Sequence, residues 1–210
     1  MFKTIVLIFI SAIPVNFLRV FLYKFFYNYN IDKNSKIGIF SIINCNEFKI
    51  RNSIIQSFTV IKVKNCNIFG SNIGKFNKLI NFNKLLVEEG SCFGIFNKVV
   101  GEPKIATDTS FIAKHSVSIK NYNYFDLTAT IVIGDKVKID SFCQFWTHSY
   151  KSDRKLACGD IIINSNSIIN NSCLISNNVT IGEGAIVGHG SVVIKNLEDN
   201  KYYYHGLYRK

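Results

Sequence analysis

The stretch VTIGEGAIVGHGSVVIKN, residues 179–196, decides the fold. Its aliphatic residues belong to a series that recurs at every sixth position: Ile163, Ile169, Ile175, Ile181, Val187 and Val193. An α-helix has about 3.6 residues per turn and would rotate such a repeat steadily around its surface, so the repeat excludes a helix. Small residues follow four positions later in most units, and Gly and Asn, which tolerate left-handed backbone angles, fill much of the remainder.

Such a unit fits one flat side of a three-sided coil, in which three units complete a turn and neighbouring turns pair through parallel strands. The same period occurs earlier, with slips in phase between the blocks: Ile31, Ile37 and Ile43; Ile73, Leu79 and Leu85; Leu127, Ile133, Ile139 and Phe145. We therefore expect an all-β solenoid over residues 31–195 with irregular corners or short insertions, followed by a C-terminal tail over 196–210.

Three motifs resemble the hexapeptide-repeat acyltransferases: IVIGDKVKID (131–140), FWTHSY (145–150) and the stretch at 179–196. The resemblance covers roughly residues 31–206 and is closest to the sugar O-acetyltransferases of polysaccharide and lipopolysaccharide biosynthesis. It implies a left-handed parallel β-helix, a handedness that breaks the usual right-handed crossover rule. It also implies acetyl-CoA as the acyl donor and a homotrimer.

A break in the period points to His148. Continuing the series beyond Phe145 would put Lys151 in the interior, where a lysine cannot replace an apolar side chain. We therefore expect the polar run at 149–160 to leave the solenoid as a loop, with His148 at its base. The resemblance implies that His148 is the general base for direct acetyl transfer, a role that suits imidazole because its unperturbed pKa is near 6.5.

The acceptor side is expected upstream, in HSVSIKNYNYFDLTATIVIG (115–134), which resembles the segment that lines this side in relatives. It offers His115, Asn123 and Asp126. Asp126 could orient His148, hold a sugar hydroxyl or cap a turn through the backbone. Trp146 is expected to form a wall beside the histidine, for a sugar face or for the pantetheine arm.

For CoA, the resemblance implies a site between neighbouring subunits, along the coils that follow the catalytic one. Carried over to this sequence, Asn171, Gly188 and His189 would contact the pantetheine region, and Lys195 would lie near the 3'-phosphate. A lysine there would neutralise the phosphate as a mobile point charge.

Residues 1–30 are expected to form a hydrophobic or amphipathic helix. The apolar run 5–13 is too short to cross a bilayer and no cleavage site follows it, so we expect neither a transmembrane helix nor a signal peptide. Beyond Pro14, helical spacing puts Asn16, Arg19, Tyr23 and Tyr27 on one face and apolar residues on the others. Either this helix packs on the end of the main domain, or it lies in a membrane interface.

The charge and the cysteine content bear on the binding partners and the cellular compartment of the protein. The formal net charge is +11, but the lysines are scattered singly without a basic run, so we expect no nucleic-acid partner. Six cysteines without a C-x-x-C pair indicate reduced, mostly buried thiols. Both features fit a cytoplasmic protein, with peripheral contact at the inner face of the plasma membrane as the interfacial alternative.

The activity expected from the sequence is acetyl transfer to a sugar hydroxyl in surface-glycan synthesis, on a sugar nucleotide or a lipid-linked glycan. N-acylation of an amino sugar and a non-catalytic sugar-binding or scaffold solenoid are the alternatives. Metal-dependent hydration on the same architecture needs three converging ligands. His115 and His148 could supply two, but Asp153 stands where the third histidine is expected, so no metal is expected.

Overall fold

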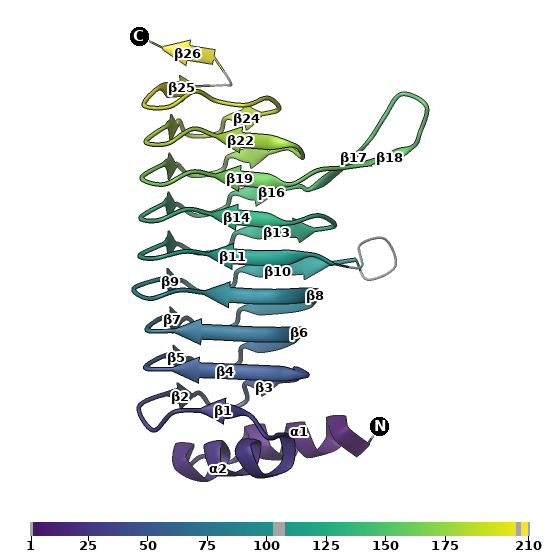
Figure 1. Cartoon of the computed structure of the whole chain (residues 1–210), viewed down its shortest axis with the longest axis vertical. Helices are drawn as coiled ribbons and strands as arrows, with labels where there is room; N and C mark the ends of the chain where they lie inside the picture. The colour runs from purple at the N-terminus through teal and green to yellow at the C-terminus, as the bar shows by residue number, and fades with distance from the viewer. Residues whose placement is uncertain (1, 103–107, 205–206, 210) are drawn as a thin grey trace.

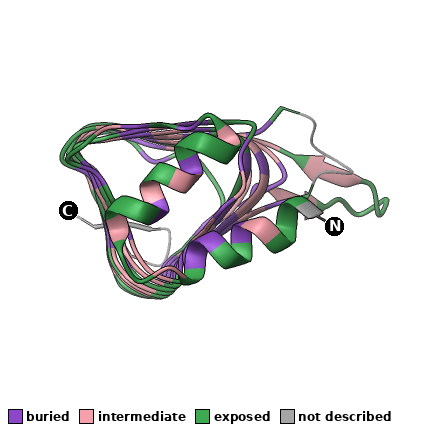
Figure 2. Ribbon diagram, turned by 90° about the horizontal axis from the view of Figure 1, so that it is seen from below, coloured by how far each residue is buried: buried purple, intermediate pink, exposed green. Residues whose placement is uncertain are grey.

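The computed structural model describes residues 2–102, 108–204 and 207–209. Its body is a parallel β-solenoid of about 9 turns with a triangular cross-section (Figures 1 and 2). One side of the triangle is a sheet of short stacked strands: β2 (Lys36–Ile37), β5 (Ile54–Ile55), β7 (Asn72–Ile73), β9 (Cys92–Phe93), β12 (Ser118–Ile119), β15 (Lys138–Ile139), β20 (Ile168–Ile169), β23 (Ile186–Val187) and β25 (Tyr202–Tyr204). The last strand, β26 (Leu207–Arg209), pairs with β25 antiparallel.

The other two sides belong to one 14-stranded sheet. They are continuous because β6 (Val60–Phe69) and β8 (Lys78–Val87) pass around the corner without a break. The remaining strands of this sheet are β1 (Asn30–Ile31), β3 (Ile42–Ile43), β4 (Glu47–Arg51), β10 (Lys98–Gly101), β11 (Ser110–Ala113), β13 (Tyr124–Leu127), β14 (Ile131–Ile133), β16 (Gln144–Phe145), β19 (Ile161–Ile163), β21 (Leu174–Ile175), β22 (Val179–Ile181) and β24 (Val192–Val193).

The six-residue period is confirmed as the interior of the solenoid. All six aliphatic residues of the C-terminal series are fully buried, and each stacks on its counterpart one coil away, as Ile169 does on Val187. The phase slips fall at one corner, where β10 leads toward β11, β13 toward β14 and β16 toward β19 (Figure 1). The register partner of Phe145 is Phe125, whereas the six-residue series predicted Leu127. The difference arises because this corner contains extra residues.

The protruding segment predicted at 149–160 is present as an antiparallel hairpin of β17 (His148–Tyr150) and β18 (Leu156–Cys158), visible at the side of Figure 1. Its two paired strands satisfy each other's backbone groups outside the solenoid. Its first residue is His148, which therefore stands where the chain leaves the solenoid.

A second corner carries an unexpected feature, a stack of aromatic rings with positive φ angles between 58° and 64°. Consecutive ring centroids lie 4.7–5.3 Å apart. Left-handed backbone costs about 1–2 kcal/mol for a residue with a side chain, and ring stacking returns about 0.5–1.5 kcal/mol per pair. The sequence analysis expected Gly and Asn at such corners, whereas this one uses Phe40, Phe58, Phe76, Phe96, Tyr122 and Phe142.

The N-terminal segment forms two helices instead of one, α1 (Phe2–Ala12) and α2 (Asn16–Tyr27), which lie across the lower end of the solenoid (Figure 2). The break falls around Pro14, because proline has no backbone N–H to continue a helix. No helix in the described part of the chain is long and apolar enough to cross a membrane.

The polar face of α2 points toward the solenoid. The Ile37 N–H donates to Asn16 Oδ1 at 3.0 Å, Arg19 Nε donates to the Ile37 carbonyl at 3.0 Å, and the Tyr23 hydroxyl donates to the Ser41 carbonyl at 3.0 Å. These bonds satisfy backbone groups of the first coil that have no coil below them. The helix pair therefore caps the end of the solenoid, as the packing alternative predicted.

Candidate active site

The corner between β13 and β14 brings together the side chains that could take part in acid–base chemistry. Asp126 lies near the end of β13, Thr128 follows in the connection to β14, and His148 begins the hairpin one coil further on. At this corner His148 is partly exposed and lies beside the buried Asp126 and Thr128. Because each is held by a strand or its immediate end, the group sits on a rigid support.

His148 and Asp126 form a hydrogen-bonded pair. The imidazole Nδ1 lies 2.8 Å from Asp126 Oδ2, and the carboxylate is 6% exposed while the imidazole is partly exposed. A carboxylate only accepts hydrogen bonds, so this contact assigns the proton to Nδ1. Nε2 then carries the lone pair, which is the arrangement that a general base requires.

Two threonines complete the network. The Thr147 hydroxyl and N–H donate to Asp126 Oδ2 at 2.9 and 3.2 Å, and the Thr128 hydroxyl donates to Oδ1 at 3.1 Å. Thr128 Oγ1 also lies 3.2 Å from His148 Nδ1. These bonds hold the buried Asp126 carboxylate in one orientation. Neither threonine was predicted from the sequence, although in an Asp-x-Thr pattern, as at 126–128, the carboxylate commonly accepts from the backbone N–H two residues later.

Aromatic rings surround the exposed edge of His148. Trp146 packs edge-on at 5.9 Å between centroids and Tyr150 at 6.5 Å, and Trp146 also rests on Tyr124 at 5.1 Å. Its indole N–H donates to Gln144 Oε1 at 3.0 Å. Trp146 therefore lies beside the histidine, and its role as a wall for a sugar face or for the pantetheine arm stays a prediction.

A groove of about 520 Å³ opens on the same corner and runs along the coils that follow His148. Ala129 borders Thr128 at one end, and its N–H donates to Thr147 Oγ1 at 2.8 Å. The lining is mixed, with amide and hydroxyl groups beside apolar ones, which suits an elongated polar ligand. The lining residues are Ala129, Cys158, Gly159, Asp160, Ile162, Asn178, Thr180 and Asn196.

Cys158 is the one thiol close to the histidine, since it is the register partner of His148 in the hairpin. Burial, and to a lesser degree the negative charge of Asp126, raise the pKa of this thiol. The thiol is therefore protonated at neutral pH, and a protonated thiol is a poor nucleophile. The geometry favours base catalysis by His148 over a covalent cysteine intermediate.

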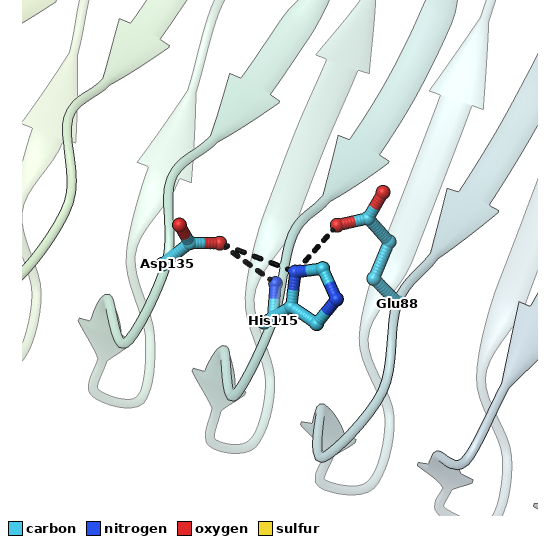
Figure 3. A group of neighbouring side chains, drawn as sticks. All are labelled: Glu88, His115 and Asp135. Carbon is cyan, nitrogen blue, oxygen red and sulfur yellow. Dashed lines mark hydrogen bonds and ion pairs between the residues drawn. The ribbon is translucent and has the colours of Figure 1, made fainter.

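His115, predicted on the acceptor side, lies at a different corner, between β11 and β12 (Figure 3). Its Nδ1 is 2.9 Å from Glu88 Oε2 and 3.5 Å from Asp135 Oδ1, and its side chain is 62% exposed. The His115 N–H donates to Asp135 Oδ1 at 3.0 Å. Within one chain His115 is thus not brought to His148, and it forms a surface ion-pair cluster with groups from the two neighbouring coils.

Asn123, also predicted on the acceptor side, lies inside the aromatic corner and is 1% exposed. Its Oδ1 accepts from the Cys143 N–H at 2.8 Å, and its own N–H donates to Asn97 Oδ1 at 2.9 Å. Its Nδ2 has no hydrogen-bond partner among the described residues. The side chain joins neighbouring coils and is covered on all sides, so an acceptor could not reach it without a change in this corner.

The residues predicted for CoA divide between two corners. Lys195 follows β24 and is exposed on the His148 corner. Asn171 and His189 are exposed near the aromatic corner, where the Gly190 N–H donates to the Asn171 carbonyl at 2.9 Å. Gly188 is buried, and its N–H donates to the Tyr203 carbonyl. Lys195 thus lies on a different corner of the solenoid from Asn171 and His189.

The three-sided solenoid, its six-residue units and the outward histidine define the class of fold as a hexapeptide-repeat β-solenoid. No protein-family model and no curated protein matches the sequence. Among solved structures, the chain is similar to a polysialic acid O-acetyltransferase, at 15% identity over 86% of this chain and 82% of that chain, with a TM-score of 0.56. This likeness confirms the fold that the motifs predicted.

Weaker likenesses are to structures of the same type. One is a hexapeptide-repeat-containing acetyltransferase from Vibrio cholerae O1 biovar eltor, complexed with acetyl coenzyme A, at 15% identity over 98% of this chain and 81% of that chain, with a TM-score of 0.41. Another is a maltose O-acetyltransferase from Clostridium difficile 630, at 22% identity over 68% of each chain, with a TM-score of 0.39.

Proposed function

We propose that this protein is an acetyl-CoA-dependent acetyltransferase that modifies a sugar hydroxyl of a surface glycan, with His148 as the general base. The observation that carries the proposal is the His148–Asp126 pair, which leaves Nε2 as a base on the corner where a ligand-sized groove opens. The groove is lined in part by Cys158, the register partner of His148. The motif resemblance and the polysialic acid O-acetyltransferase of similar fold support the choice of acyl transfer to a glycan.

In the proposed reaction, Nε2 of His148 takes the proton of the acceptor hydroxyl as its oxygen attacks the thioester carbonyl carbon. The tetrahedral intermediate then collapses, the carbon–sulfur bond breaks, and the imidazolium returns the proton to the leaving CoA thiolate. Asp126 stabilises the imidazolium and fixes the ring, while Thr128 and Thr147 hold the Asp126 carboxylate.

CoA is proposed to lie along the groove, with Lys195 neutralising the 3'-phosphate at its far end. We propose a homotrimer, in line with the motif resemblance, in which Asn171 and His189 of one subunit contact a cofactor held at the His148 corner of its neighbour. The acceptor would meet Trp146, whose exposed surface can pack against a sugar face.

The acceptor is proposed to be a sugar nucleotide or a lipid-linked glycan, in the cytoplasm. The six cysteines are all free, which suits a reducing compartment. N-acylation of an amino sugar would use the same base and the same donor, so an acceptor panel must contain both hydroxyl and amino sugars.

Turnover of acetyl-CoA with such a panel tests the proposal. We expect His148→Ala to lose at least about 1,000-fold in kcat/KM, and His115→Ala, the same substitution at the other corner, to stay within about twofold. Equal turnover by wild type and His148→Ala would refute the base assignment. Tight CoA binding without turnover on any acceptor would favour the binding-module alternative.

A further inference from the structure

The helices at the end of the solenoid present an apolar surface to the outside. The buried residues of α2 are Arg19 and Tyr23. Val20 and Leu22 are partly buried, and the phenylalanines of the helix are exposed, Phe17 to 75% and Phe25 to 72%. This reverses the usual arrangement, in which an amphipathic helix buries its apolar stripe. The exposed surface, here called the end platform, consists of Ile5, Ile8, Phe9, Val15, Phe17, Leu18, Phe21, Phe25 and Phe26.

The reversal has a physical cause at the solenoid side. The first coil leaves backbone groups unpaired, and the polar side chains of α2 bond them, so the polar face cannot point to solvent. The apolar face is then unpartnered within the described chain. A contiguous surface of this size on a folded protein marks a binding surface.

Charge indicates what covers the end platform. Residues 1–30 contain three basic residues and no Asp or Glu. Lys3 and Lys24 are exposed on the helices, and Lys33 and Lys36 are exposed on the first coil beside them. A second copy docked end to end would bring these positive groups against their own counterparts, whereas an anionic lipid surface complements them.

A hollow of about 520 Å³ borders the end platform, between the two helices and the segment at 45–46. Its lining combines apolar Val6, Phe25 and Phe26 with Lys3, Tyr27, Asn28, Cys45 and Asn46. An apolar hollow with a basic group at its edge fits a phospholipid, whose acyl chain and phosphate need these two environments side by side.

We propose that the protein docks end-on to an anionic bilayer through the end platform, with both helices in the plane of the interface and the solenoid axis along the membrane normal. Five inter-strand steps separate β2 from β15, in the coil of His148. At about 4.8 Å per step and about 10 Å for the helix layer, His148 stands roughly 30 Å from the interface.

This height specifies the acceptor, if the proposed acetyl transfer holds. The site would reach sugars of a membrane-anchored glycan several units away from the lipid, and it would miss the sugar attached to the lipid itself. The docking is independent of catalysis, and it can fail or hold whatever the fate of the acetyltransferase proposal.

Co-sedimentation with phosphatidylcholine vesicles, with and without phosphatidylglycerol, tests the docking. We expect binding to the anionic vesicles, weakened at least about tenfold by Phe17→Ser/Phe21→Ser/Phe25→Ser. Phe142→Ser is the matched control, because its ring is 58% exposed against 54% for Phe21 but lies at the aromatic corner. Lys3→Gln/Lys24→Gln should remove the preference for anionic vesicles, and melting temperatures verify that each variant is folded.

Three outcomes would overturn the proposal. The first is absence of binding to anionic vesicles by the folded full chain. The second is equal binding by the triple variant. The third is a particle mass in lipid-free solution that halves in the triple variant, because this would identify a second copy as the occupant. His148→Ala should bind vesicles like the wild type, which separates docking from chemistry.

The single tryptophan reports the orientation. Trp146 neighbours His148 far from the end platform, so brominated lipids, which quench only on contact, should leave the fluorescence of the bound wild type unchanged. In a Trp146→Phe background, Phe21→Trp should be strongly quenched. Quenching of Trp146 in the bound wild type would exclude the end-on orientation.

Discussion

Replacing Asp126 with Asn tests the arrangement around His148 most directly. The amide keeps an acceptor at the Oδ2 position, which receives the bonds from His148 and Thr147, but it places a donor opposite the Thr128 hydroxyl. Thr128 must then turn its hydrogen away and accept from the amide instead. The imidazole still donates from Nδ1 to the amide oxygen, but a neutral amide does not stabilise the imidazolium that forms when Nε2 takes a proton.

The size of the effect follows from the bonds lost. A hydrogen bond to a buried charged group is worth about 1.5–3 kcal/mol, which corresponds to about 10- to 150-fold in rate. We therefore expect kcat to fall by about this factor, because the neutral amide no longer stabilises the imidazolium. The KM for acetyl-CoA should stay within about threefold, because Asp126 lies beneath the histidine and not along the groove.

The assay is chromatographic measurement of released CoA, since the exposed Cys92 would react with a colorimetric thiol reagent. Thr128→Val is the matched control. It keeps the carboxylate and the Nδ1–H tautomer, and should lose less activity than Asp126→Asn, because Thr147 still holds the carboxylate. If Asp126→Asn turned over within threefold of the wild type, the pairing of Asp126 with His148 would have no catalytic role.

Three further predictions concern the thiol, the aromatic corner and the cap. Because burial and Asp126 raise the pKa of the Cys158 thiol, intact mass spectrometry of the protein with acetyl-CoA alone should detect no acetyl adduct on Cys158, and a stoichiometric adduct would contradict direct transfer. Phe76→Ala should lower the free energy of unfolding by about 1–3 kcal/mol through two lost ring contacts, and Phe76→Gly by about 1 kcal/mol less, since glycine adopts the φ of 59° without strain; the opposite order in denaturant unfolding would show that backbone strain is not relieved there. Arg19→Met should cost about 2–4 kcal/mol, because carbonyl groups of Ile13 and Ile37 lose a buried charged donor, whereas Lys24→Met on the exposed side of the same helix should change little; similar melting temperatures for the two variants would argue against the cap.

The fold was predictable because its repeat is carried by residues that must be buried. Ile169 and Val187 occupy the same place in successive coils, and any solenoid with this period has to stack them. Corner residues follow weaker rules. Phe76 occupies a left-handed position that sequence reasoning assigns to Gly or Asn, and only its neighbours one coil above and below make a ring acceptable there.

The site was predictable in part. His148 could be located because a lysine interrupts the apolar series after it, and Asp126 was a candidate for orienting it. The two threonines were not predicted because their contacts depend on which residues of neighbouring coils meet at one corner. Asn123 and His115 were grouped on the acceptor side because the segment 115–134 resembles the one that lines this side in relatives. Within one chain they lie at other corners than His148, because a three-sided coil sends residues a few positions apart to different corners.

Because the coils stack in register, the distance from the capped end to any coil is a whole number of inter-strand spacings. One coil adds about 4.8 Å between the capped end and the reactive corner, and no smaller increment is available without breaking the pairing of strands. Duplication or loss of a single coil between β5 and β12 would therefore move His148 by a fixed step while leaving its own surroundings intact. Chains with this fold can therefore differ in the height of the reactive corner by whole coils, through gain or loss of one repeat at a time.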